Sequence, residues 1–157
     1  MNWQQLCTDP VLCDLPYKVE LNERGQIIMS PARLAHGAFQ SEIVSILSKL
    51  IEQKGRVIIE CAIRTRKGTK VADAAWFSKP RWEDVKDEYD APIAPEICIE
   101  VLSPGNTAKE MRDKKRLYFD SGAEEVWFCA ENGKLSFYGK IGKLKNSALV
   151  PEFPKKI

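Results

Sequence analysis

The chain has 157 residues and a formal net charge of +2, from 24 basic and 22 acidic side chains. This length favours one domain with a real core, spanning 1–157, and the balanced charge argues against a protein that coats DNA through overall basicity. No stretch approaches the roughly 20 apolar residues that span a bilayer, and no signal peptide is recognised, so we expect a cytoplasmic protein without a membrane partner.

The first third of the chain predicts a hairpin and then a long helix. After an N-terminal extension over 1–16, two short strands are expected on either side of a turn at 22–25, in the stretch YKVELNERGQIIMSP. Pro31 opens a helix over about 32–54, which Gly55 ends. Apolar residues recur along that helix at helical spacing: Leu34, Phe39, Ile43, Ile46, Leu47 and Leu50.

The rest of the chain predicts five strands and one helix. RVIIECAIRT and KVADAAWFS are strands joined by a turn at 67–69, and EICIEV is a strand that Pro104 and Gly105 end. Asn106 or Thr107 can cap a helix that runs to about Ser121, and Glu110 stands three residues after Thr107, as in a capping box. EEVWFCA and KLSFYGK form a last hairpin around ENG. Strands interrupted by two helices indicate an α/β (α+β) fold, with helices packed on a mixed sheet.

Three successive strands each carry a carboxylate within an apolar run: Glu60, Asp73 and Glu100. Strict alternation places Val57 and Cys61 on one face of their strand and Glu60 on the other. A buried carboxylate needs a cation or a hydrogen-bond partner. Each acid can therefore pair with an Arg or Lys, face solvent, or share a metal ion with the others. Oxygen ligands without histidine clusters favour Mg or Mn over zinc.

Basic residues gather in two segments, 63–70 and 109–116. Such clusters permit a nucleic-acid face and are equally typical of a solvated surface. The candidate phosphate-binding residues are Arg64, Arg66, Lys67, Lys70, Lys109, Arg112 and Lys115. In the second segment, Lys114 and Lys115 both fall on the side of the helix that faces the core, and helical periodicity does not choose between them.

Several motifs together resemble the Uma-type endonuclease family, a branch of the restriction endonuclease-like PD-(D/E)XK superfamily. They are IIMSPARLAHGAFQSEI, GRVIIECAIRT, VADAAWFS, PEICIEVLSPGNT, KKRLYFDSGAEEVWF and SALVPEF. These motifs cover nearly all of the chain from about Tyr17. The resemblance implies a restriction endonuclease-like mixed β-sheet flanked by helices, with an N-terminal hairpin, and a metal-dependent nuclease site.

The resemblance also assigns roles to individual residues. Asp73 and Glu100 match the metal-binding acids of the motif, and Glu60 matches a further acid on the first core strand. Leu102 stands where the superfamily has its lysine, and Lys114, four residues before Tyr118, matches the lysine that the family takes from the following helix. His36 matches a recurrent family histidine, although a lone histidine is also typical of a helix end at the surface. Ala72 replaces the proline of the superfamily motif.

The resemblance therefore implies a metal-dependent endonuclease that hydrolyses DNA phosphodiester bonds, with Asp73, Glu100, Lys114 and Glu60 as catalytic residues and Asp73 and Glu100 holding Mg or Mn. Two alternatives remain open: a non-catalytic nucleic-acid-binding or regulatory module on the same fold, and a nuclease of RNA or branched DNA. The predicted hairpins and the tryptophans Trp3 and Trp82 would allow a homodimer without demanding one.

Overall fold

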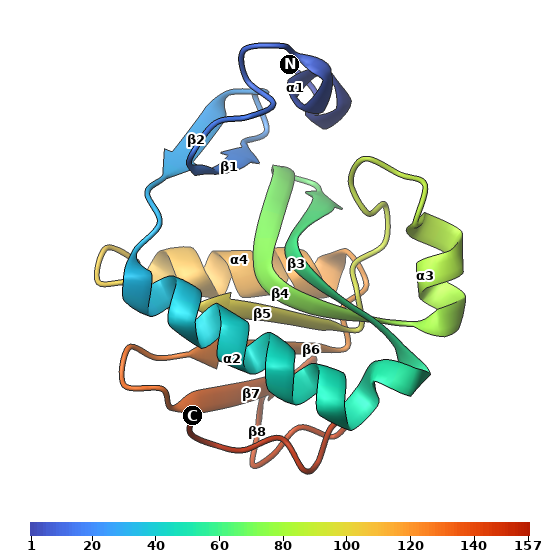
Figure 1. Cartoon of the computed structure of the whole chain (residues 1–157), viewed down its shortest axis with the longest axis vertical. Coiled ribbons are helices and arrows are strands. Elements are labelled where there is room, and N and C mark those ends of the chain that lie inside the picture. Colours follow the sequence, from blue (N-terminus) through green and yellow to red (C-terminus); the bar gives the residue numbers. More distant parts are fainter.

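One six-stranded sheet and one two-stranded hairpin form the frame of the molecule (Figure 1). The structure, a computed structural model, describes the backbone of residues 1–157 and every side chain except that of residue 52. The elements follow the order α1 (Trp3–Thr8), β1 (Lys18–Leu21), β2 (Ile27–Ser30), α2 (Leu34–Ile51), η1 (Glu52–Lys54), β3 (Gly55–Thr65), β4 (Gly68–Ser78), α3 (Lys79–Val85), β5 (Ile97–Val101), α4 (Ala108–Asp120), β6 (Glu125–Cys129), β7 (Leu135–Gly139) and β8 (Lys143–Leu144).

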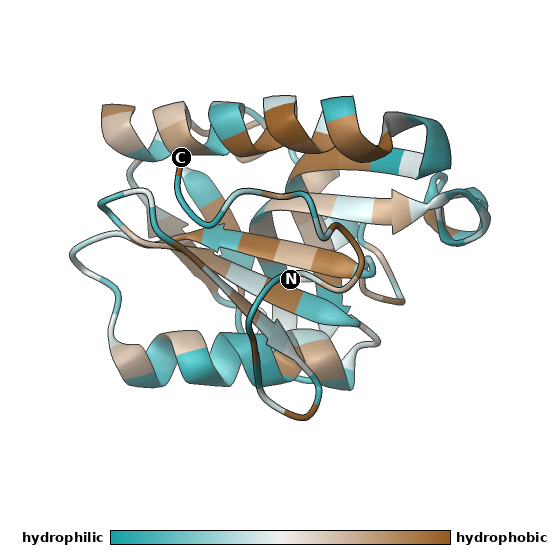
Figure 2. Ribbon diagram, turned by 90° about the horizontal axis from the view of Figure 1, so that it is seen from below, coloured by the Kyte–Doolittle hydropathy of each residue, from teal (hydrophilic) through white to brown (hydrophobic). Residues whose placement is uncertain are grey.

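The large sheet is mixed, as the sequence predicts. Its strands lie in the order β3-β4-β5-β6-β7-β8, and only β5 and β6 run parallel. A parallel pair needs a crossover connection, and α4 supplies it. Figure 2 shows the sheet between α2 on one face and α4 on the other. This arrangement confirms the predicted mixed sheet flanked by helices.

Two apolar clusters fill the spaces on either side of the sheet. On the α2 side, Ile43, Leu47 and Ile51 pack against Trp76, Ile97, Ile99, Trp127 and Phe137. On the other side, Val85 of α3 and Tyr118 of α4 pack against Ala75, Phe77, Cys98 and Val126. The strands β4, β5 and β6 contribute to both clusters, so apolar residues on both of their faces are buried.

Most of the predicted elements are confirmed, and three further elements appear. The long helix ends in the 3₁₀ turn Glu52–Lys54, and α4 begins with the predicted capping box of Thr107 and Glu110. The unpredicted elements are α1, α3 and β8. The start of α3 does carry signals in the sequence, because Ser78 accepts a hydrogen bond from the Arg81 N–H and a proline stands in the first turn.

The N-terminal hairpin docks on the half of β4 that β5 leaves uncovered. β5 pairs with β4 only at residues 74–76. Nearer the start of β4, Glu20 Oε1 accepts a hydrogen bond from Val71 N at 2.9 Å, and Lys70 Nζ donates to Leu21 O at 3.3 Å. The hairpin therefore lies over the point where β4 and β5 separate.

Strict alternation fails where β3 and β4 pass Glu60 and Asp73. Glu60 has φ +50°, and the register joins Ile59 to Ala74 and Cys61 to Ala72 without a Glu60–Asp73 pair. Val57 packs in the cluster on the α2 side, whereas Cys61 packs in the opposite cluster. The predicted shared face of Val57 and Cys61 is therefore wrong, because a left-handed residue interrupts the two-residue period.

All five cysteines are free thiols, and burial raises the pKa of Cys61 to about 12. Its thiol is therefore protonated at neutral pH and behaves as an apolar core group. Among the helices described, none is long and apolar enough to cross a bilayer.

The turn between β3 and β4 should tolerate glycine alone at position 68. Gly68 has φ +85°, and an added Cβ would lie 2.3 Å from Leu21 O of the hairpin. We expect Gly68→Ala to lower the free energy of unfolding by about 1–3 kcal/mol through backbone strain, measured by urea denaturation.

Gly37→Ala is the matched control for that substitution. Gly37 lies within α2, and an added Cβ would meet no atom within 4 Å. Alanine there should raise stability by about 0.5–1 kcal/mol. Equal effects of the two substitutions would contradict the requirement for glycine at position 68.

Candidate active site

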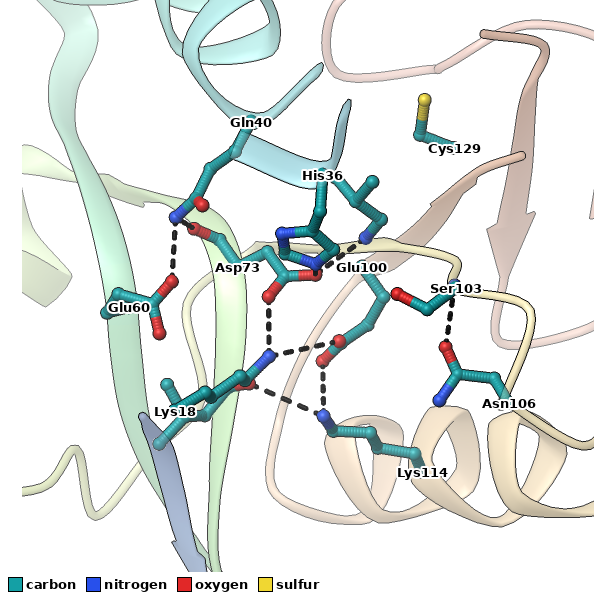
Figure 3. Close-up of polar contacts among 12 residues, drawn as sticks. Lys18, His36, Gln40, Glu60, Asp73, Glu100, Ser103, Asn106, Lys114 and Cys129 are labelled. Carbon is teal, nitrogen blue, oxygen red and sulfur yellow. Dashed lines mark hydrogen bonds and ion pairs between the residues drawn. The ribbon is translucent and has the colours of Figure 1, made fainter. Parts of the chain in front are cut away.

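Asp73 lies at the point where β4 and β5 separate, and three donors surround its carboxylate (Figure 3). Oδ1 accepts a hydrogen bond from Lys18 Nζ at 2.5 Å, whereas Oδ2 lies 3.1 Å from His36 Nε2 and 2.7 Å from the Val101 N–H. The side chain is 1% exposed. Because each oxygen has a donor, the carboxylate is held in one orientation.

Glu100, on β5, faces the same space from the α4 side. Its Oε1 accepts a hydrogen bond from Tyr118 OH at 2.5 Å and forms an ion pair with Lys114 Nζ at 2.9 Å, and its Oε2 lies 3.5 Å from Lys18 Nζ. The side chain is 4% exposed. The carboxylates of Asp73 and Glu100 therefore converge on one ammonium group, that of Lys18.

The structure places Lys114 in this cluster and Lys115 outside it. Lys114 Nζ contacts Glu100 Oε1 and Glu20 Oε1, the latter at 2.7 Å, and donates to Val71 O at 3.4 Å. Lys115 Nζ lies 3.9 Å from the centre of the Tyr138 ring. The two neighbouring lysines thus have separate surroundings, a difference that helical periodicity left open.

Lys18 and Glu20, both on β1, complete the cluster, although the sequence analysis did not single them out. Two residues apart on a strand, they point to the same side, as alternation predicts. A Lys-x-Glu pair on a short strand is more often a solvated face. Only the docking of the hairpin on β4 turns that face inward, so no local signal marks these residues.

The charges of the cluster shift one another's pKa values. Burial opposes ionisation of Asp73, but the hydrogen bond from His36 and the ammonium of Lys18 outweigh it and hold its pKa well below the usual range. Burial also opposes the charged forms of Lys18 and Lys114, yet the neighbouring carboxylates, Glu100 first among them, raise the pKa of both lysines. The burial of Glu100 outweighs its two lysines and raises its pKa.

His36 and Gln40 connect α2 with the acids of β3 and β4. His36 lines the cavity beside Asp73, and its hydrogen bond with that carboxylate raises its pKa. Gln40 Nε2 donates to Glu60 Oε1 at 2.8 Å and to Asp73 O at 2.7 Å. Glu60 is therefore joined to Asp73 through the Gln40 amide, and within the described structure it forms no ion pair with either lysine of the cluster.

These groups line a cavity of about 710 Å³ between the hairpin, α2 and α4. Seven carboxylates and five lysines border it, so its net charge is −2 when His36 is neutral. Three of the candidate phosphate-binding lysines are among them: Lys67, Lys70 and Lys109. A divalent cation would bring this charge to zero.

The remaining candidate phosphate-binding residues lie elsewhere. Arg64 Nη2 lies 2.7 Å from Asp90 Oδ1, and Arg66 Nε lies 3.0 Å from Asp120 Oδ2. Arg112 is exposed on α4. Arg64 and Arg66 therefore already have carboxylate partners at the surface. Of the three candidate lysines at the cavity, Lys109 has a carboxylate partner, Asp113.

The donor set fits a hard cation held by few protein ligands. Among the described residues, no group of three or more His, Cys, Asp or Glu is arranged as a complete metal cage. Asp73 and Glu100 do present one oxygen each to a common cationic group, the Lys18 ammonium. Mg²⁺ is usually held by one or two carboxylates together with water and substrate phosphates, which suits this pair.

Comparisons with known proteins agree with this fold. The model of a family described as putative restriction endonuclease, Uma2, matches residues 10–150. The crystal structure of a putative nuclease belonging to DUF820, from Anabaena variabilis, superimposes with a TM-score of 0.71 at 20% identity. The match covers 98% of this chain and 82% of that one. No curated protein matches the chain.

The pair of His36 and Asp73 should make stability depend on pH. Because the pKa of His36 is raised in the folded protein, the pair contributes fully below the unfolded value of about 6.5 and is lost as pH rises through the folded value. We expect His36→Gln to cost about 1.5 kcal/mol at acid pH and progressively less at alkaline pH.

Urea denaturation of both proteins across that pH range measures the difference. Asp73 stays ionised throughout, because its pKa is lowered, and His36 is the only histidine of the chain. A constant difference between the two proteins from acid to alkaline pH would contradict a charged pair.

Proposed function

This chain belongs to the Uma2 family of putative restriction endonucleases, and we propose that it is a magnesium-dependent endonuclease that hydrolyses phosphodiester bonds in DNA. One observation carries the proposal: Asp73 and Glu100, on neighbouring core strands, direct their carboxylates at one cationic group inside a cavity. Two adjacent carboxylates of this kind suit the positioning of a metal ion for phosphoryl chemistry.

In this proposal Asp73 and Glu100 hold the metal ion, Mg or Mn. A divalent cation bound there would polarise the scissile phosphate and lower the pKa of the attacking water. The lowered pKa of Asp73 keeps its carboxylate available as a ligand at any physiological pH. The donors at its other oxygen, His36 and the Val101 N–H, leave Oδ1 directed at the cavity.

Lys114 is the proposed electrostatic stabiliser of the reaction. Its ammonium is held by Glu20 and by Val71 O as well as by Glu100, so its position does not depend on the metal-binding carboxylates alone. The neighbouring carboxylates raise its pKa and keep it charged. A fixed positive group beside the metal-binding acid can stabilise negative charge that develops on the phosphate.

Glu60 is proposed to act from a greater distance, through Gln40. Its backbone is in the left-handed region, which a non-glycine residue adopts only when the surrounding structure holds it there. The Gln40 amide joins its carboxylate to the main chain of Asp73. Glu60 would thus help to orient the Asp73 segment and could reach the metal through water.

Nucleic acid would approach across the lysines of the cavity. Lys67, Lys70 and Lys109 border the opening and can contact backbone phosphates on either side of the scissile bond. Such contacts carry no sequence information, so they support cleavage without indicating a recognition sequence. Of the remaining candidates, Arg112 and Lys115 lie on α4 and would extend this basic surface.

The proposal predicts cleavage that requires both a divalent cation and the two carboxylates. Supercoiled plasmid incubated with Mg²⁺ should be nicked or linearised, and chelation should abolish the products. Asp73→Asn should lower the rate by at least about 10²-fold, because it weakens the metal site. Gel electrophoresis of plasmid, single-stranded DNA and RNA in parallel measures the activity and ranks the substrates.

The same assay separates the proposed function from its alternatives. Preferential cleavage of RNA or of branched DNA would replace the DNA substrate and keep the chemistry. Metal-independent binding of nucleic acid without cleavage would overturn the nuclease and indicate a non-catalytic binding module.

The two neighbouring lysines of α4 should differ in their effect on the reaction. Lys114→Ala should lower the cleavage rate by about 10²-fold or more, the scale for losing one electrostatic stabiliser. It should also cost about 3–5 kcal/mol of stability, because Glu100 and Glu20 then lose a buried partner. Rates must therefore be compared at a temperature where circular dichroism shows both proteins folded.

Lys115→Ala is the matched control. Its ammonium rests on the Tyr138 ring, so its loss should weaken DNA binding in a salt-dependent way and leave the rate at saturating DNA near that of the wild type. An inactive Lys115→Ala beside a normal Lys114→Ala would reverse the assignment of the two lysines.

A further inference from the structure

Lys18 is the cationic group that stands where the two proposed metal-binding carboxylates converge (Figure 3). Its ammonium lies 2.5 Å from Asp73 Oδ1 and 3.5 Å from Glu100 Oε2. It approaches from the N-terminal hairpin, on the opposite side of the cluster from α4. Its side chain is 17% exposed, so it covers carboxylates that would otherwise face the cavity.

The two lysines of the cluster are held in different ways. Lys114 has Glu20 and the carbonyl oxygen of Val71 as partners in addition to Glu100. The contacts of the Lys18 ammonium within the described structure are with Asp73 and Glu100 alone. If another cation takes those two oxygens, Lys114 keeps its other partners, whereas Lys18 loses both of its own.

A divalent cation and the Lys18 ammonium cannot use the same carboxylate oxygens at once. Two like charges a few ångströms apart in a partly dehydrated space repel strongly, and a divalent ion repels an ammonium more than a second ammonium would. The backbone of β1 is anchored, because Lys18 pairs with Ser30 in the hairpin and Glu20 accepts a hydrogen bond from Val71 N. The exchange therefore requires movement of the Lys18 side chain alone. The flexible lysine side chain can swing within the cavity.

We propose that Lys18 occupies the cation position of the metal-free protein, that a divalent cation displaces its ammonium, and that the released ammonium binds a phosphate oxygen of the substrate. This inference rests on the proposed function, since it concerns the same carboxylates. It assigns Lys18 a second positive charge beside the scissile phosphate, supplied by the hairpin, whereas Lys114 acts from α4.

The charge of the cavity supports the proposed binding of the released Lys18 ammonium to a phosphate oxygen of the substrate. With His36 neutral, a divalent cation would bring the net charge along the cavity wall from −2 to zero, and Lys18 would lose its carboxylate partners. A phosphate bound to the same cation would bring a new negative group within reach of that ammonium. Metal binding would thus convert Lys18 from a counter-ion of the protein into a ligand of the substrate.

The first experiment measures metal affinity, which is a readout separate from activity. Mn²⁺ is titrated into the full-length, metal-free protein by isothermal calorimetry. Lys18→Met should bind Mn²⁺ about tenfold or more tightly than the wild type, because the metal no longer competes with an internal cation. Lys67→Met removes the same charge from the wall of the same cavity and should change the affinity less than about twofold.

The second measurement follows the binding of a fluorescent DNA oligonucleotide with phosphorothioate linkages, which resist hydrolysis. With Mn²⁺, Lys18→Met should bind it about tenfold more weakly than the wild type, the scale of one charge-assisted hydrogen bond. With chelator present, the two proteins should bind it equally, because the wild-type Lys18 is then held by Asp73 and Glu100.

A third measurement uses the wild type alone and so does not depend on how the variant folds. Amine labelling followed by mass spectrometry should show Lys18 protected without metal and labelled faster with Mn²⁺, whereas Lys114 should stay protected in both states. Ion pairing in a buried position protects an ammonium from labelling. The exchange would remove this protection from Lys18, whereas Lys114 keeps its contacts with Glu20 and Val71 O.

The outcomes distinguish the exchange from the proposed function. Metal binding that is equally tight in the wild type and Lys18→Met would overturn the exchange and leave the metal-dependent nuclease standing. Tighter metal binding with unchanged oligonucleotide affinity would overturn the role of Lys18 at the phosphate. Failure of every variant to bind Mn²⁺ would overturn the metal site itself and the exchange with it.

Discussion

The burial of four charged side chains in one small space is the constraint on which the rest of this structure depends. Asp73, Glu100, Lys18 and Lys114 are each less than one-fifth exposed, and each carboxylate has an ammonium partner. An isolated buried charge would be too costly to retain, so each member of the cluster requires the others. The hairpin, the sheet and α4 must therefore come together for any one of these residues to be accommodated.

The site exists because two strands separate. β4 pairs with β5 over residues 74–76 only, and Asp73 is the next residue of β4 beyond that pairing. Its carboxylate accepts a hydrogen bond from the Val101 N–H of β5, a donor that lies beyond the backbone pairing of β4 and β5. The unusual backbone of Glu60 opposite this point marks the same irregularity on β3. The departure from regular sheet geometry and the position of the candidate chemistry thus coincide, as strain and function often do.

The N-terminal hairpin both closes the cluster and supplies part of it. Lys18 neutralises the two carboxylates that would hold a metal, and Glu20 fixes Lys114 through a direct ion pair. Such pairing gives both carboxylates positive partners without a metal ion, so neither is left as an isolated buried charge. A metal ion bound by these two carboxylates would have to displace the Lys18 ammonium, so the ion pairs that stabilise the metal-free fold would lower the affinity for the metal.

The sequence alone was enough to predict the mixed sheet, both long helices and the carboxylates of Asp73 and Glu100, because apolar periodicity, capping residues and embedded acids are local signals. It did not determine that Lys18 and Glu20 belong to the site, that Lys114 rather than Lys115 faces it by geometry, or that Val57 and Cys61 lie on opposite faces. These features depend on how the hairpin docks on β4 and on the left-handed backbone at Glu60. Contacts between segments some fifty residues apart carry no periodic signal, so only the tertiary structure decided them.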